Sequence, residues 1–266
     1  SMMKNSELSK DLSLSHITQG FWRLTSWNFN TDELVQFMHD CIDCGVTSFD
    51  TAELYGKYTC ELEMGKALKK DPSLRKQIQI ITKTGINKPA QGNHYTMNHY
   101  ETSYEKIMSS CEKSLKNLGV DVIDLYLIHR EDPFMDITEI AKAFKEIKEK
   151  GWVKEVGVSN FNPVQFDALQ KACGGTLVCN QIECSPLQFE HFNNNNMDYL
   201  QAQKVHPMFY SPLAGGKIFT SDEESALKLK TVLTELSQKY ICDLDTLVYA
   251  WLLKHPVKGI AISGSS

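Results

Sequence analysis

Four side chains that could work together in one reaction stand at or just after the ends of short β-prone runs: Asp50, Tyr55, Lys83 and His129. A lysine ammonium beside a tyrosine stabilises the phenolate and draws the phenol pKa down from about 10, so the tyrosine can donate a proton. An aspartate paired with the lysine keeps the ammonium charged, and a neutral histidine can orient a carbonyl oxygen. The four groups predict a general acid aimed at a carbonyl that receives a hydride.

Other chemistries fit these positions less well. No serine or cysteine stands at a strand end beside a base, which argues against acyl transfer. A metal-dependent hydrolase barrel would want paired histidines on the first strand, but that strand runs into Asp50-Thr51-Ala52, so no metal is expected. Two structural alternatives stay open: Asp50 and Lys83 as a buried ion pair without chemistry, and His129 as a hydrogen-bonded core histidine.

Alternating strands and helices would position these groups. Apolar residues recur at helical spacing from Thr31 to Cys44, where Asn30 and Glu33 form a capping arrangement and Gly45 ends the helix. The alternation continues along the whole sequence. We expect strands at 46–49, 78–82, 122–128, 153–158, 176–182, 205–210 and 258–262, and further helices near 60–70, near 101–118, from about 136, from 163, and near 195–203, 222–240 and 245–254.

The strand runs are nearly continuous in apolar residues, which is typical of a parallel sheet covered by helices. No G-x-G-x-x-G follows the first strand and no phosphate-binding G-x-x-x-x-G-K-[ST] occurs, which argues against the common open nucleotide-binding sheets. A closed (β/α)8 barrel, the TIM barrel of the α/β class, is therefore favoured over an open doubly wound sheet. In a barrel the C-terminal strand ends meet at one rim, so the four polar groups would converge there.

The composition excludes several other classes. The chain has 266 residues and a formal net charge of −5, which argues against nucleic-acid or membrane-surface partners. No apolar run approaches the length of about 20 residues that spans a bilayer, and the start lacks the apolar region of a secretory signal. The eight cysteines are scattered apart from Cys41 and Cys44, so we expect reduced thiols and a cytoplasmic protein.

Several segments together resemble the aldo-keto reductase family, in particular its bacterial NADP-dependent oxidoreductases. They are GVTSFDTAELYG (45–56), ELEMGKAL (61–68), TKTG (82–85), LGVDVIDLYLIH (118–129), VGVSNF (156–161) and YSPL (210–213). The resemblance extends from about Gly20 to the end of the sequence, and its ordered set of motifs is far more specific than any one of them.

This resemblance implies a (β/α)8 barrel that binds NADPH, with NAD as the alternative cofactor, across its C-terminal rim. By position, Tyr55 is the proton donor, Lys83 and Asp50 tune it, and His129 orients the carbonyl. Trp22, Tyr55 and His129 contact the substrate. The implied cofactor contacts are Gly20 and Trp22 beside the nicotinamide, Ser159, Asn160 and Gln181 on its carboxamide, Tyr210 stacked on the ring, Ser211, Leu213, Gly215 and Gly216 along the pyrophosphate, and the segment Ser263, Gly264 and Ser265.

Some of these positions also have structural interpretations from sequence alone. Ser159-Asn160 fits turn chemistry, Tyr210 fits barrel packing, and a glycine pair at 215–216 fits a flexible turn. The polar loop 87–99 is expected to be a substrate lid or a surface loop rather than a metal site. Candidate apolar walls for a substrate are Trp22, Trp27 and Tyr58, whereas Asp124, inside a strand, is expected to bond to backbone or a neighbour.

The resulting hypothesis is a reductase that converts an aldehyde or ketone to an alcohol, acting on a small-molecule substrate as a monomer or weak dimer. The alternative is a cofactor-binding, redox-sensing subunit of a larger complex with little turnover. We expect residues 1–266 to form a single barrel domain. Because the resemblance implies a further helix or helices after the last strand, we expect the sequence as given to lack that C-terminal part.

Overall fold

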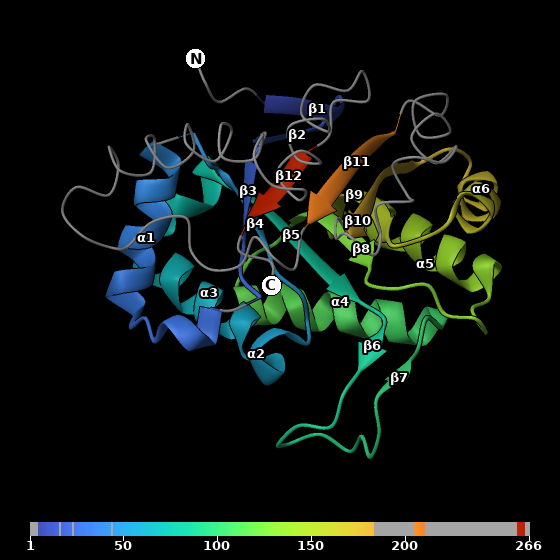
Figure 1. Cartoon of the computed structure of the whole chain (residues 1–266), viewed down its shortest axis with the longest axis horizontal. Helices are drawn as coiled ribbons and strands as arrows, with labels where there is room; N and C mark the ends of the chain where they lie inside the picture. Colours follow the sequence, from blue (N-terminus) through green and yellow to red (C-terminus); the bar gives the residue numbers. More distant parts are fainter. Residues whose placement is uncertain are drawn as a thin grey trace, which may run out of the picture.

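The computed structural model describes residues 5–15, 17–22, 24–43, 45–183, 205–210 and 260–263, with the strands at 206–210 and 260–263 described by their backbone alone. Eight parallel strands close into a barrel in the order β10, β11, β12, β3, β4, β5, β8, β9 (Figure 1). Their bounds are β3 Ile17–Gly20, β4 Ser48–Asp50, β5 Gln79–Thr84, β8 Ile123–Ile128, β9 Val153–Ser159, β10 Leu177–Glu183, β11 His206–Tyr210 and β12 Ile260–Ser263.

The predicted closed barrel is therefore confirmed, and seven of its strands match the seven predicted runs. The eighth strand, β3, was not predicted. It pairs with β12 on one side and β4 on the other, and so closes the ring. β3 is only four residues long, and Thr18 and Gln19 are polar although they are buried. Its sequence therefore lacks the apolar run that marks the other strands.

Helices cover the outside of the barrel (Figure 1). They are α1 Thr31–Asp43, α3 Cys60–Lys70, α4 Tyr104–Leu118, α5 Ile137–Glu149 and α6 Pro163–Ala172, with the short turns η1 Leu24–Trp27, α2 Tyr55–Tyr58 and η2 Pro72–Gln77. The expected helices near 195–203, 222–240 and 245–254 lie outside the described residues.

Local capping sets where these helices begin. Asn30 and Glu33 exchange side-chain and backbone hydrogen bonds at the start of α1, which confirms the predicted capping arrangement. The helix expected near 101–118 begins at Tyr104, because the Ser103 side chain accepts a hydrogen bond from the Lys106 N–H. A glycine is required at Gly65 in α3, since a Cβ there would lie 2.1 Å from the Asn117 carbonyl oxygen.

Residues 5–15 form a hairpin that precedes the barrel. Strands β1 (Asn5–Ser9) and β2 (Leu12–Ser15) pair antiparallel, and Figure 1 shows them across the end of the barrel where the strands begin. The hairpin's leucines form one buried cluster with inward-facing residues of the barrel: Leu8, Leu12, Leu14, Ile81, Leu125, Leu127 and Cys179. This apolar plug fills the N-terminal end and leaves the polar side chains to the opposite end.

Strand alternation separates two layers along β5. Ile81 joins the cluster inside the barrel, whereas Ile80 packs in the larger core between the barrel and its helices. Lys83 therefore faces inward at the C-terminal end, and Thr82 and Thr84 face the helices. Asp124 in β8 bonds to the Ile80 N–H and to Arg75, as the sequence led us to expect. Within the described ranges, no helix is long and apolar enough to cross a membrane.

Candidate active site

A single lysine organises the C-terminal mouth of the barrel. The Lys83 Nζ donates to Asp50 Oδ2 at 2.8 Å, to the Thr51 carbonyl oxygen at 2.8 Å and to Tyr55 Oη at 3.3 Å. An ammonium has three N–H donors, so these three acceptors satisfy it completely. Burial lowers the pKa of Lys83, and the Asp50 carboxylate opposes this shift. Because the Tyr55 oxygen accepts from Lys83, its own O–H proton is directed away from the ammonium.

The Asp50 carboxylate is held by a second donor across the barrel. Its Oδ1 accepts from the Gln181 amide at 3.0 Å, so Asp50 links β5 on one side to β10 on the other. Asp50 and Gln181 are both nearly inaccessible to solvent. The pair Asp50–Lys83 is therefore a buried ion pair whose remaining polar atoms are hydrogen-bonded, as buried charges require.

The segment that carries Tyr55 is tied by its backbone to β5. The N–H of Thr51 donates to Ile81 O, and the N–H of Glu53 donates to Lys83 O. After Tyr55 the chain turns sharply, with Gly56 and Lys57 at φ of 62° and 54°. A Cβ at Gly56 would also meet three side-chain atoms closer than 3.0 Å, so glycine suits this turn on both counts.

His129 follows β8 and faces Tyr55. The two ring centroids are 5.7 Å apart in an edge-to-face arrangement. Burial lowers the pKa of His129 well below its usual value, and the cations Lys83, Arg130 and Lys88 lower it further. The imidazole is therefore neutral at physiological pH, and its Nδ1 has no hydrogen-bond partner among the described residues.

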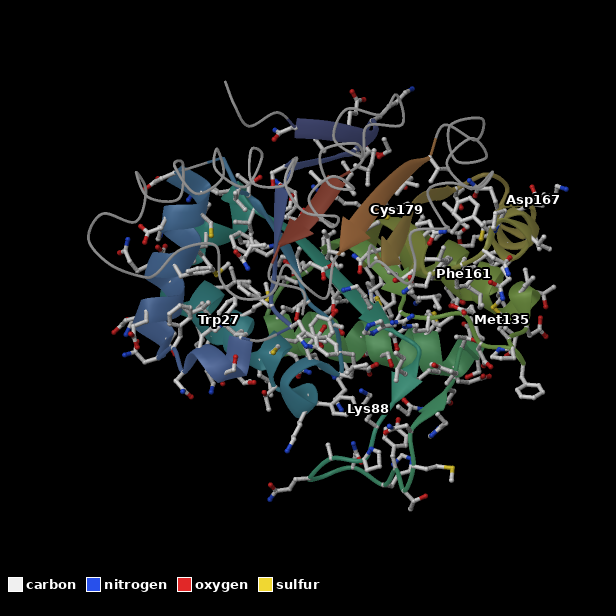
Figure 2. The ribbon with its side chains drawn as sticks, in the orientation of Figure 1. Trp27, Lys88, Met135, Phe161, Asp167 and Cys179 are labelled. Atoms are coloured by element: carbon white, nitrogen blue, oxygen red, sulfur yellow. The ribbon has the colours of Figure 1, made fainter. Side chains whose placement is uncertain are left out.

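Two adjoining cavities open onto these rings. The larger, of about 680 Å³, is lined by His129 and by both ends of the loop between β6 and β7; the smaller, of about 410 Å³, is lined by Tyr55 and Tyr58. They share the lining residues Trp22, Leu54, Lys88 and Asn98. Figure 2 labels Lys88 at the base of the β6–β7 hairpin, beside α2. A molecule that spans both cavities would therefore meet the Tyr55 phenol in one and the His129 imidazole in the other.

The predicted substrate walls divide between these cavities and the core. Trp22 is 41% exposed, lines both cavities and meets the Tyr55 ring edge-to-face at 5.0 Å. Trp27 was expected as a further candidate wall, but it packs against Phe21, Phe29 and Phe37 beside α1 (Figure 2). The Trp27 side chain is partly buried against the core and does not line either cavity.

The loop after β5 forms part of the cavity wall. Strands β6 (Ile86–Asn87) and β7 (His99–Tyr100) pair antiparallel and project from the barrel mouth (Figure 1). The Asn87 amide donates to Glu101 and lies 3.1 Å from His99 Nε2, while His99 Nδ1 contacts the Met97 carbonyl. Asn98 and His99 line the larger cavity, so the loop borders the site rather than lying apart from it.

A second polar group stands beside Asp50 at the ends of β9 and β10. Ser159 and Gln181 are register partners, and the Ser159 hydroxyl donates to the Gln181 carbonyl oxygen at 2.9 Å. The Asn160 amide contacts Ser159 Oγ at 3.3 Å, and its φ of 57° turns the chain out of the strand. Hydroxyl and amide groups in one place have the donors and acceptors that a carboxamide needs.

The other predicted cofactor positions fall on several parts of the mouth. Gly20 ends β3 as the register partner of Asp50, which places it at the same rim. Tyr210 and Ser263 end β11 and β12, where the backbone alone is described. The remaining predicted contacts, Ser211, Leu213, Gly215, Gly216, Gly264 and Ser265, lie outside the described residues.

Sequence reasoning missed two features of the site. One is the Thr51 carbonyl, the third acceptor of Lys83, which no residue type could have indicated because it is backbone. The other is Glu53, whose buried carboxylate accepts from Thr84 Oγ1 at 2.8 Å and from Ser110 Oγ at 2.9 Å. A charged residue two positions before Tyr55 was the available signal, although its partners lie far along the chain.

We expect the buried His129 to make the protein less stable as the pH falls. Since its pKa in the folded chain lies well below the usual 6.5, the unfolded chain binds a proton below that pH that the folded chain excludes. The free energy of unfolding should then fall with pH by up to about 1.4 kcal/mol per unit until the folded pKa is reached.

Glu61 contributes in the opposite direction, because burial raises its pKa from 4.5 to about 7 and the folded chain holds the extra proton between those values. The test therefore compares how steeply the free energy of unfolding changes with pH in three proteins. They are the wild type, His129→Gln and His94→Gln, a substitution at an exposed histidine, each unfolded in urea between about pH 7.5 and about pH 5.5. His129→Gln should lose less stability than the other two. Equal losses in all three proteins would contradict the expectation.

A closed (β/α)8 barrel with a buried Lys–Asp–Tyr cluster and a neutral histidine at its mouth is the arrangement of a barrel enzyme, whose titratable groups lie at its strand ends. A model of the Aldo/keto reductase family matches residues 16–266, and the chain belongs to this family of oxidoreductases. Members of the family typically use NADH or NADPH. The resemblance seen in the sequence motifs is thereby confirmed.

Relatives cover almost the whole chain. It is 40% identical over 269 residues to the "Uncharacterized oxidoreductase YcsN" of Bacillus subtilis strain 168, covering 99% of this chain and 88% of that protein. It is also 40% identical over 267 residues to a "6-dehydroglucose reductase" of Agrobacterium fabrum strain C58, covering 99% and 89%. The solved structure of aldo-keto reductase AKR11C1 from Bacillus halodurans matches with a TM-score of 0.72 at 25% identity, covering 99% of this chain and 87% of that chain.

Proposed function

We propose that the protein reduces an aldehyde or ketone to an alcohol by hydride transfer from NADPH, with Tyr55 as the proton donor. The observation that carries this proposal is the contact of one buried ammonium, Lys83 Nζ, with both Tyr55 Oη and Asp50, beside cavities that the Tyr55 and His129 rings line. No other group of the described residues combines a proton donor, a charge to stabilise its anion and an adjoining cavity.

The proton transfer follows from this contact. As the substrate carbonyl oxygen gains negative charge, Tyr55 donates its O–H proton to that oxygen and becomes a phenolate. The Lys83 ammonium, already hydrogen-bonded to the tyrosine oxygen, stabilises the phenolate as it forms. Asp50 keeps the ammonium charged in a site where burial alone would favour the neutral amine.

His129 orients the substrate in this scheme. A neutral imidazole can donate one N–H to the carbonyl oxygen without placing a second cation beside Lys83. Burial, and after it the cations Lys83, Arg130 and Lys88, lowers the pKa of His129 and keeps it neutral. Tyr55 and His129 then hold the same oxygen from two directions, which fixes the carbonyl plane relative to the barrel mouth.

The residues at the ends of β9 and β10 fit a nicotinamide. When bound, the reduced nicotinamide supplies the hydride to the carbonyl carbon. Ser159, Asn160 and Gln181 would hold its carboxamide, and Gly20 and Trp22 would border it, while Gln181 simultaneously holds Asp50. The roles of Tyr210, Ser211, Leu213, Gly215, Gly216, Ser263, Gly264 and Ser265 stay predictions from the family motifs.

The cavity lining favours polar carbonyl substrates. The larger cavity combines the cations Lys88 and Arg130, the carboxylate of Asp132 and the exposed aromatic rings of Tyr100 and Phe134. Donors, an acceptor and aromatic faces together suit a hydroxylated aldehyde better than a plain hydrocarbon chain. The reductase from Agrobacterium fabrum whose printed name is 6-dehydroglucose reductase is in keeping with this substrate class.

The test is a binding titration with NADPH and with NADH, followed by a panel of hydroxylated, anionic and alkyl aldehydes assayed by loss of the reduced nicotinamide absorbance. We expect tighter binding of NADPH, and turnover that is highest for hydroxylated aldehydes. Tight cofactor binding with no turnover of any carbonyl would contradict the proposal and favour a redox-sensing subunit.

A further inference from the structure

We propose that Glu53, paired with Lys106, is a positioning residue that holds Tyr55 within hydrogen-bond distance of Lys83. This inference rests on the proposed function, because it assigns Glu53 to the placement of the proposed proton donor. Glu53 stands two residues before Tyr55, is 9% exposed and takes no part in the chemistry itself. Its side chain faces away from the cavity, toward α4.

The Glu53 carboxylate accepts four hydrogen bonds from three donor groups. Oε2 accepts from Thr84 Oγ1 at 2.8 Å and Oε1 from Ser110 Oγ at 2.9 Å, while Lys106 Nζ lies 3.4 Å from each oxygen. Thr84 belongs to β5, and the other two residues belong to α4. The loop before Tyr55 is therefore fastened by charge-assisted bonds to a barrel strand and to a helix at once.

Two successive residues of β5 hold this loop from opposite faces. Lys83 points into the barrel mouth and contacts Tyr55, whereas Thr84 points outward and contacts Glu53. The backbone N–H groups of Thr51 and Glu53 donate to Ile81 O and Lys83 O, and neither bond involves the Tyr55 side chain. The outward anchor at Glu53 completes the restraint, so that the phenol cannot rise from the ammonium without breaking buried hydrogen bonds.

The same pair reaches the cavity wall. Lys106 Nζ lies 5.9 Å from the centre of the Tyr95 ring, and Tyr95 packs edge-to-face on His99, which lines the larger cavity. Lys106 is itself buried at the start of α4, where Ser103 caps the helix. The pair thus connects the loop that carries Tyr55 with the loop that borders the substrate space.

The test replaces the pair in two ways. Glu53→Leu with Lys106→Met substitutes apolar groups of similar size, which avoids leaving one buried charge unpaired but removes the acceptor of Thr84 and Ser110. Glu53→Gln with Lys106→Met removes the charges but keeps one acceptor oxygen, and its amide NH2 can donate to the other hydroxyl oxygen. The matched control is Glu63→Leu with Lys66→Met, which removes a solvent-exposed ion pair of the same residue types in α3.

We expect the Leu/Met protein to lose about 10- to 100-fold in kcat, because small misplacements of a reacting group cost this much. NADPH affinity should change less than about twofold, since the carboxamide-binding residues lie on other strands. The Gln/Met protein and the Glu63/Lys66 control should keep kcat within about threefold of the wild type. Full kcat in the Leu/Met protein would overturn the proposal.

Two further experiments, a double-mutant cycle and a crystal structure, separate a positioning role of Glu53 from a purely structural one. If Glu53 acts through Tyr55, Tyr55→Phe should cost a smaller factor in the Leu/Met background than in the wild type. Equal factors would overturn the proposal.

A crystal structure of the Leu/Met protein should show Tyr55 Oη farther from Lys83 Nζ than the 3.3 Å of the wild type. If the Leu/Met protein does not fold, Thr84→Val, which removes the hydrogen bond from β5 to Glu53 and keeps the ion pair, is measured by the same cycle and structure. The structural readout holds even if the wild type reduces no carbonyl, which separates this proposal from the proposed function.

Discussion

Tyr55→Phe is expected to lower the turnover of an aldehyde by about 10²- to 10⁴-fold, the range typical of removing a general acid. The substitution deletes one oxygen atom, whose partner is Lys83 Nζ at 3.3 Å. Lys83 keeps its two shorter bonds to Asp50 and to the Thr51 carbonyl, so the ion pair beneath the ring should persist. The expected result is therefore a loss confined to the chemical step.

This prediction is checked by steady-state kinetics together with NADPH titration and thermal unfolding. Cofactor affinity and stability should remain near those of the wild type. The matched control is Tyr104→Phe, which removes a hydroxyl that donates to Glu146 on the outside of the barrel. Turnover in Tyr55→Phe as high as in Tyr104→Phe would remove Tyr55 from the role of proton donor.

Lys83→Met is expected to damage both turnover and stability. It leaves the Asp50 carboxylate almost fully buried, with the Gln181 amide as its remaining side-chain donor. Breaking a buried ion pair by removing one partner typically costs about 3–5 kcal/mol, because the other charge stays desolvated and unpaired. Turnover should fall as well, since the phenolate of Tyr55 then forms without its stabilising cation.

The two effects of Lys83→Met can be separated by a second substitution. Asp50→Asn in the Lys83→Met background removes the stranded charge, so urea unfolding should show that part of the stability returns. Turnover should not return, because the ammonium is still missing. Lys69→Met, at an exposed position of α3, controls for the loss of a lysine. Recovery of turnover in the double variant would show that Lys83 serves only the fold.

The barrel could be predicted from sequence where each strand carries its own apolar signal. Strands such as β8, with six buried residues in a row, match the predicted runs closely. β3 carries no such signal, because its polar Thr18 and Gln19 are buried by neighbours that lie far along the chain. The leucines of β2 alternate in the strand period, so the N-terminal hairpin, unlike β3, does carry a local signal.

The sequence was enough to predict which residue types form the site and at which strand ends they lie. The rule that barrel chemistry lies at the C-terminal strand ends brings Asp50, Lys83 and His129 together, and in the structure they lie at one mouth. Distances and pairings depend on tertiary contacts. Nothing local indicates that Glu53 meets Lys106 on α4, or that Trp27 packs on phenylalanines beside α1 while Trp22 lines the cavities.

The proposed function depends above all on the transfer of a hydride from a nicotinamide to a carbonyl carbon at this barrel mouth. The most direct measurement uses NADPH carrying deuterium at the transferred position and determines the mass of the alcohol formed from a hydroxylated aldehyde. We predict that each turnover places one deuterium on the former carbonyl carbon. An alcohol that contains no deuterium, or oxidation of the cofactor without any alcohol, would contradict the account.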